Sequence, residues 1–144
     1  MLRELGPALA GVYDATPTVV LGPVSRGSLL GALTAAALGV GFVEMRKQAG
    51  TWVDSDRWVW RTTSPDYQDR HVVFGFRRHL IRPSDHVLMV DDWIDTGATA
   101  RAAKALVEEC GAHWIGAACV VDGLTEPRLR YELPVRALLD VRQL

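Results

Sequence analysis

Residues 87–100 read VLMVDDWIDTGATA, and this stretch decides the fold class. An apolar run typical of a buried strand leads into two adjacent carboxylates, Asp91 and Asp92, and a Thr-Gly-Ala-Thr turn then opens a helix. Adjacent like charges repel, so the pair favours a partner that supplies hydrogen-bond donors or positive charge, such as a sugar diol or Mg²⁺. The turn presents backbone N–H groups and hydroxyls at the positive end of a helix dipole, which suits a phosphate. The stretch therefore predicts a sugar phosphate site, with a solvated strand end and an N-cap at Asp95 as the structural alternative.

The remainder of the chain predicts an α/β fold, in one domain over residues 1–144, with a mainly parallel central sheet flanked by helices. Apolar runs predict strands over 18–22, 40–45, 71–76, 86–90, 113–122 and 135–141. Helical spacing predicts helices over 3–14, 28–38 and 98–110. Because ligands of such sheets bind beyond the carboxyl ends of the strands, we expect 23–27, 46–70, 91–99 and 122–126 along one rim.

Composition narrows the partners and the compartment. The formal net charge is −1, so there is no electrostatic case for nucleic acid. The most apolar stretch is about 15 residues long, short of the roughly 20 that span a bilayer, and the N-terminus does not resemble a signal peptide. Cys110 and Cys119 fit a reducing cytosol. We therefore expect a cytoplasmic protein without membrane contact.

Residues 46–70 differ from the rest because they are charged, rich in Trp and without sustained periodicity. A long stretch of this kind in a small domain is usually a lid or is disordered, so we predict a flexible catalytic loop. Three roles stay open for its aromatic residues: closing over a ligand, packing on a partner subunit, or packing locally. These residues are Trp52, Trp58, Trp60 and Tyr67.

The stretch 87–100 resembles the phosphoribosyl-diphosphate (PRPP) signature of type I phosphoribosyltransferases: an apolar strand, two acidic residues and a phosphate turn. Residues 21–47, LGPVSRGSLLGALTAAALGVGFVEMRK, resemble the corresponding part of adenine phosphoribosyltransferases. The resemblance implies the type I fold and a Mg²⁺-dependent transfer of the 5-phosphoribosyl group from PRPP to a nitrogen heterocycle, most readily a purine-like base, with release of pyrophosphate. It also implies a homodimer. A non-catalytic sensor of PRPP or nucleotides on the same fold is the alternative.

The resemblance also implies roles for individual residues. Asp91 and Asp92 would hold the ribose hydroxyls, partly through Mg²⁺, and would act in catalysis together with Arg26. The 5′-phosphate would bind to Asp95, Thr96, Gly97, Ala98 and Thr99. Pyrophosphate would bind to Ser25, Arg26, Gly27, Arg46 and Lys47. A cis peptide bond is expected between Ser25 and Arg26.

The acceptor site is the part for which the resemblance implies least. Only about 17 residues precede the first predicted strand, which implies a reduced hood over the acceptor. A catalytic-type Glu of the adenine enzymes would fall near residues 74–76, where this chain has Gly75. Trp93 and Asp122 are the acceptor-binding candidates, against the alternatives of packing on the next helix for Trp93 and a strand-end turn for Asp122.

Overall fold

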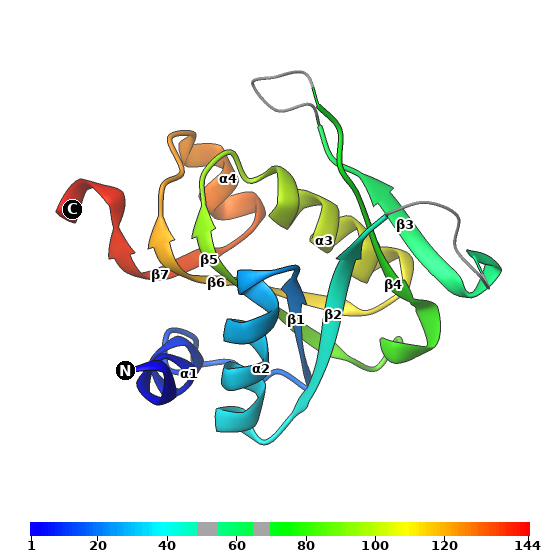
Figure 1. Cartoon of the computed structure of the whole chain (residues 1–144), viewed down its shortest axis with the longest axis horizontal. Helices are drawn as coiled ribbons and strands as arrows, with labels where there is room; N and C mark the ends of the chain where they lie inside the picture. Colours follow the sequence, from blue (N-terminus) through cyan, green and yellow to red (C-terminus); the bar gives the residue numbers. More distant parts are fainter. Residues whose placement is uncertain (49–54, 65–69) are drawn as a thin grey trace.

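The computed structural model describes residues 1–48, 55–64 and 70–144. A seven-stranded sheet with strand order β3-β4-β2-β1-β5-β6-β7 forms its centre (Figure 1). The strands are β1 (Val19–Pro23), β2 (Gly41–Lys47), β3 (Trp58–Thr62), β4 (Val73–Arg77), β5 (His86–Ile94), β6 (His113–Asp122) and β7 (Val135–Asp140). The helices are α1 (Leu2–Ala10), α2 (Arg26–Leu38), α3 (Ala98–Glu109) and α4 (Pro127–Glu132), with 3₁₀ turns at Ser55–Arg57, Arg78–Leu80 and Val141–Gln143.

Five neighbouring strands, β2, β1, β5, β6 and β7, run parallel, as the continuous apolar runs predict. One core cluster packs α1 and α2 against one face of the sheet through Leu9, Leu30 and Val90. A second cluster packs α3 and α4 against the other face through Leu106, Leu129 and Met89. Because all five strands point the same way, the carboxyl ends of β1, β2, β5 and β6 meet at one edge, where the predicted motifs lie.

Strand β5 is longer than the predicted strand 86–90, because its ladder to β6 continues to Ile94. Asp91 and Asp92 therefore lie within a central strand, close to its carboxyl end, and not in the loop that follows it. Helix α1 is shorter than predicted and ends at Ala10, where Gly11 donates its N–H group to the carbonyls of Pro7 and Ala8. The other predicted helices and parallel strands match within three residues at each end.

The prediction that residues 46–70 form a structureless loop is wrong for part of the segment. Residues 58–62 form β3, which pairs antiparallel with β4 at the edge of the sheet. The sequence did not predict this strand because its apolar run, Trp58 to Trp60, is only three residues long and is flanked by charged residues. In the structure Val59 is buried in the core, and the Trp58 and Trp60 rings stack at 4.9 Å on the opposite face. Residues 49–54 and 65–69, including Trp52 and Tyr67, lie outside the described residues.

Both cysteines are free thiols and buried, Cys110 at the end of α3 and Cys119 in β6. Across residues 1–48, 55–64 and 70–144, no helix has the length and apolar character that crossing a membrane requires.

Candidate active site

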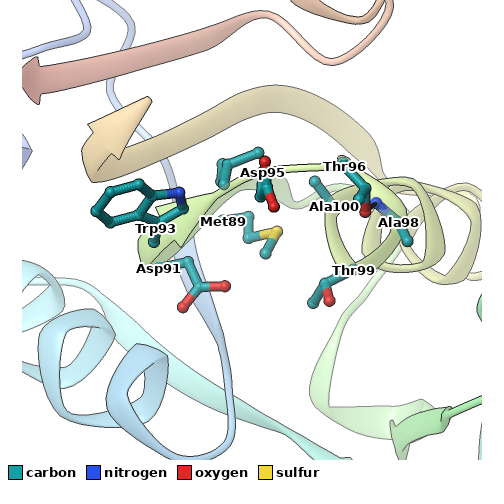
Figure 2. A pocket seen from close by; sticks show the side chains of 10 residues that line it. Met89, Asp91, Trp93, Asp95, Thr96, Ala98, Thr99 and Ala100 are labelled. Atoms are coloured by element: carbon teal, nitrogen blue, oxygen red, sulfur yellow. Dashed lines mark hydrogen bonds between the residues drawn. The ribbon is translucent and has the colours of Figure 1, made fainter. Parts of the chain in front are cut away.

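Two adjoining pockets lie at the carboxyl edge of the sheet, and both are lined by Asp91 and Thr99. The first, here called the turn pocket, has a volume of about 160 Å³ and lies over the connection from β5 to α3 (Figure 2). It is lined by Met89, Asp91, Trp93, Ile94, Asp95, Thr96, Gly97, Ala98, Thr99 and Ala100. The second, the loop pocket, has a volume of about 220 Å³ and is lined by Pro23, Val24, Ser25, Arg26, Lys47, Phe74, Asp91, Asp92 and Thr99. Because they share lining residues, the two pockets are neighbours, and together they are called the cleft below.

The turn pocket is built around the start of α3. Gly97 adopts a left-handed conformation with φ of 79°, which a residue with a side chain rarely adopts. Thr96 Oγ1 accepts a hydrogen bond of 3.3 Å from the N–H group of Ala98. The other N–H groups of the first turn of α3 have no acceptor within the helix. The turn pocket lies at this end of α3, where the helix dipole is positive. The turn has the geometry of an anion site, and phosphate binding there stays a prediction.

Gly97 also lies next to three leucine side chains. A methyl group at position 97 would approach side chains of Leu129, Leu133 and Leu124 at 3.2, 3.3 and 3.4 Å. These residues belong to α4 and to the segments before and after it. Apolar residues from the C-terminal third of the chain thus pack against the turn. The sequence around the turn could not predict this contact.

Each of the two acidic side chains accepts a hydrogen bond from the backbone N–H group of the residue that follows it. Asp91 Oδ1 accepts a hydrogen bond of 2.8 Å from the N–H group of Asp92, and Asp92 Oδ1 accepts one of 2.9 Å from the N–H group of Trp93. Burial raises the pKa of Asp91 to about 7; the backbone N–H group of Asp92 opposes this shift, and the Asp92 carboxyl adds to it. Asp91 is thus a carboxyl group that changes charge near neutral pH and that gains from a ligand able to supply positive charge or donors.

Arg26 approaches the acidic pair from the start of α2. Its Nε lies 2.7 Å from Oδ2 of Asp92, and its side chain is 81% exposed, whereas that of Asp92 is 26% exposed. The resemblance implies that Arg26 binds the pyrophosphate group and that Asp92 binds the ribose. The structure brings the two side chains together at the mouth of the loop pocket.

The loop before α2 contains the expected cis peptide bond, but at a different position. The cis bond joins Val24 to Ser25, and the prediction of a cis bond between Ser25 and Arg26 is wrong. Helix α2 begins at Arg26 with Ser25 as its N-cap in helical conformation, so the peptide between them belongs to the helix entry. The N–H group of Val24 donates to the carbonyl of Met45 at 3.0 Å, which ties the loop to β2.

The adjacent basic residues at the end of β2 point to opposite faces of the sheet, because side chains alternate along a strand. Lys47 lines the loop pocket and pairs in register with Phe74. Arg46 points to the other face, where its Nε lies 2.9 Å from Oε1 of Glu44. Lys47 lines the loop pocket and Arg46 does not, so Lys47 is the stronger pyrophosphate candidate and the role of Arg46 stays a prediction. Phe74 also lines this pocket, although the sequence did not point to it.

Gly75 faces away from the cleft. A methyl group at position 75 would lie 2.1 Å from Cε3 of Trp60, so the Trp60 ring covers this position on the face opposite Phe74. The Glu that the resemblance would place near this position is absent, and the sensor alternative therefore stays open.

The two acceptor candidates have different surroundings. Asp122 is 5% exposed, its Oδ1 accepts a hydrogen bond of 2.9 Å from the N–H group of Leu124, and its Oδ2 forms an ion pair with Arg130. Both oxygens have partners in the segment after β6, so the structure favours the structural alternative for Asp122, and its acceptor-binding role stays a prediction. Trp93 is 43% exposed and lines the turn pocket. Its indole lies close to Gly123: a methyl group at position 123 would be 2.6 Å from Nε1 of Trp93.

Comparison with known proteins agrees with this geometry. The family model of the phosphoribosyl transferase domain matches residues 3–141. The chain is 37% identical over 140 residues to the adenine phosphoribosyltransferase of Methylobacillus flagellatus, covering 95% of this chain and 74% of that protein. The crystal structure of the adenine phosphoribosyltransferase of Rhodothermus marinus superimposes with a TM-score of 0.81 at 32% identity, covering 97% of this chain and 79% of the other.

A third relative carries ligands. The Saccharomyces cerevisiae adenine phosphoribosyltransferase, crystallised with an imino-altritol bisphosphate and adenine, has a TM-score of 0.73 at 33% identity, covering 88% of this chain and 69% of the other. The chain belongs to the phosphoribosyl transferase family. Its fold is the type I fold, and the predicted class, a pentosyltransferase that acts on PRPP, is confirmed.

Proposed function

We propose that the chain transfers the 5-phosphoribosyl group of PRPP to a purine base, with adenine as the first candidate, and releases pyrophosphate. The observation that carries the proposal is that the turn pocket and the loop pocket are neighbours and share Asp91 and Thr99. PRPP has a phosphate at one end, a diol in the middle and a pyrophosphate at the other end. The cleft offers a helix start, an acidic pair and a basic loop in that same order.

The roles of the side chains follow from this alignment. The turn residues Asp95 to Thr99 receive the 5′-phosphate, and the acidic pair accepts hydrogen bonds from the ribose hydroxyls. Lys47, Arg26 and the backbone of residues 24–27 surround the pyrophosphate. In the reaction the bond from C1 of the ribose to the pyrophosphate oxygen breaks with both electrons going to the oxygen. The lone pair of the acceptor nitrogen forms the new bond to C1, and the acceptor N–H proton is released to water.

The cationic groups of the loop pocket favour this step, because negative charge grows on the departing pyrophosphate. Positive charge grows on the ribose at the same time, and the carboxylate of Asp92 lies beside it. Retention of both Arg26 and Lys47 in the loop pocket favours turnover over a sensor that only binds the ligand.

The acidic pair fits a Mg²⁺ ion that is shared with the substrate. In the ranges 1–48, 55–64 and 70–144 no group of three or more His, Cys, Asp or Glu side chains could hold a metal ion by itself. Mg²⁺ is usually held by one or two carboxylates together with substrate oxygens and water, and Asp91 and Asp92 supply those carboxylates. When bound, the ion would neutralise charge on the pyrophosphate.

The acceptor is proposed to lie against the exposed indole of Trp93. The ring is at the edge of the turn pocket, and a planar heterocycle gains from stacking on an aromatic face. Adenine is the first candidate because the relatives are adenine phosphoribosyltransferases and the yeast structure holds adenine.

The remaining expectations concern the assembly and the loop. We expect a homodimer, supported by the exposed apolar residues Leu2 and Leu29 on the neighbouring helices α1 and α2, which are 53% and 51% exposed. The prediction of a catalytic loop that closes over the cleft is kept for the parts of 46–70 on either side of β3, with β3 and β4 as their fixed base. Two buried free thiols suit a reducing compartment such as the cytoplasm.

The test is pyrophosphate release from PRPP with Mg²⁺ and a panel of purines, pyrimidines and heterocyclic acids. Release that depends on a purine supports the proposal. PRPP binding by calorimetry without release across the panel would favour the PRPP sensor, and no binding of PRPP would refute the site.

A further inference from the structure

The ion pair between Arg26 and Asp92 occupies atoms that the proposed ligand needs. Asp92 Oδ1 accepts a hydrogen bond from the N–H group of Trp93, which leaves Oδ2 as the oxygen without a backbone donor. Arg26 Nε lies 2.7 Å from this same Oδ2. A ribose hydroxyl or a cation that binds Asp92 at Oδ2 therefore competes with Arg26 for this oxygen.

The displaced guanidinium has a second destination within reach. Arg26 is 81% exposed and lines the loop pocket, so its side chain is free to turn without disturbing the core. A pyrophosphate group in the loop pocket would offer it oxygens in the fork geometry that a guanidinium prefers. A ligand without a pyrophosphate offers no such replacement.

We propose that Arg26 selects for ligands that carry a pyrophosphate, by exchanging Asp92 for that group when PRPP binds. The inference rests on the proposed function and deepens it. A sugar phosphate that lacks the pyrophosphate, such as ribose 5-phosphate or a nucleoside monophosphate, breaks the ion pair without compensation and binds more weakly. After transfer, departure of the pyrophosphate returns Arg26 to Asp92, which favours release of the nucleotide product.

The size of the effect follows from exposure. Exposed ion pairs contribute little, and a factor of about two to five in affinity is the expected penalty for a ligand that must break this one. For PRPP the penalty is offset by the new contact, because charge-assisted bonds to phosphate oxygens are stronger than average.

The experiment compares wild type with Arg26→Ala by calorimetry in the presence of Mg²⁺, with PRPP and ribose 5-phosphate as ligands. Arg82→Ala is the matched control, because it removes the same charge from an exposed arginine in the connection that precedes the far end of β5. Arg26→Ala is expected to weaken PRPP binding about tenfold or more and to tighten ribose 5-phosphate binding about two- to fivefold. Arg82→Ala is expected to leave both affinities within about twofold of wild type.

Opposite changes in the affinities for PRPP and for ribose 5-phosphate are the expected result of the exchange. Ribose 5-phosphate binding that is weakened or unchanged in Arg26→Ala, alongside weaker PRPP binding, would overturn the inference and leave the proposed function standing. Wild type that binds neither ligand would overturn the proposed function itself, and the inference with it. Circular dichroism of Arg26→Ala shows separately that the exposed substitution leaves the fold intact.

Discussion

Gly27 lies directly against the carboxylate of Asp91: a methyl group on Gly27 would be 2.9 Å from Asp91 Oδ1 and 2.7 Å from Cδ of Pro23. Distances of this size are shorter than carbon contacts in folded proteins allow. The missing side chain at Gly27 therefore lets the loop before α2 and the acidic pair of β5 share one cleft, although the two segments are far apart in the sequence.

Gly27→Ala is expected to push Asp91 and the loop apart. We expect Mg²⁺–PRPP affinity to fall about tenfold or more, and overpacking to lower the free energy of unfolding by about 1–3 kcal/mol. Calorimetry and urea unfolding measure the two effects. Gly41→Ala is the control, because its new methyl group would meet only Cγ2 of Val19 at 3.9 Å. Equal PRPP affinities in the two variants would contradict the proposed contact.

The double substitution Asp91→Asn with Asp92→Asn is expected to abolish measurable PRPP binding while the fold is kept. Both carboxylates lose their charge, and hydrogen bonds to charged groups contribute about 1.5–3 kcal/mol each, so the affinity should fall by about 100-fold or more. Circular dichroism checks the fold, and calorimetry measures the affinity. Unchanged PRPP affinity would be incompatible with the assigned site.

The raised pKa of Asp91 predicts a pH dependence of stability. Burial raises this pKa from its ordinary value of 3.8 to about 7, so between these values the folded chain binds more protons than the unfolded chain. The contribution of Asp91 to stability is therefore greatest below about pH 4, falls as the pH rises to about 7 and is constant above that. Urea unfolding of wild type and Asp91→Asn from pH 5 to pH 8 isolates this contribution. Asp91→Asn should gain in stability relative to wild type as the pH rises, and parallel curves would contradict the assignment.

Ligand binding is expected to follow the opposite trend. An ionised Asp91 accepts hydrogen bonds and attracts Mg²⁺, so the affinity for Mg²⁺–PRPP should rise as the pH passes 7. Binding should also release a proton below pH 7, which calorimetry detects as a heat that depends on the ionisation enthalpy of the buffer. A heat independent of the buffer at pH 6 would contradict the expected ionisation of Asp91 on binding.

Trp93 and Gly123 are expected to act together on the acceptor. A methyl group at Gly123 would lie 2.6 Å from Nε1 of Trp93, so Gly123→Ala should tilt the indole out of its place. We expect Gly123→Ala and Trp93→Ala each to raise the KM for the acceptor about five- to tenfold, because a stacking contact of about 1 kcal/mol is lost together with buried area. The affinity for PRPP should change less than about twofold, since the acidic pair and the turn are intact. Steady-state kinetics with varied acceptor provide the measurement, and an unchanged acceptor KM in both variants would remove Trp93 from the acceptor site.

The features that the sequence predicted are those that depend on residues close together in the chain. Continuous apolar runs predicted the parallel strands, because strands covered on both faces need apolar residues at every position. The acidic pair and the turn at 95–99 predicted the kind of ligand, because a strand end, a left-handed glycine and a helix start lie within ten consecutive residues. In each case the physical cause acts between neighbours in the chain.

The tertiary structure decided what depends on partners distant in sequence. The strand at Trp58–Thr62 exists because it pairs with β4, and alternation along β2 separated Lys47 from Arg46. The burial of Asp122 required Arg130, and the ion pair of Arg26 with Asp92 required α2 to pack against β5. The sequence alone determined which chemical groups the cleft could hold. Only packing decided which of them face it, because a side chain's direction is set by the register and contacts of its whole strand or helix.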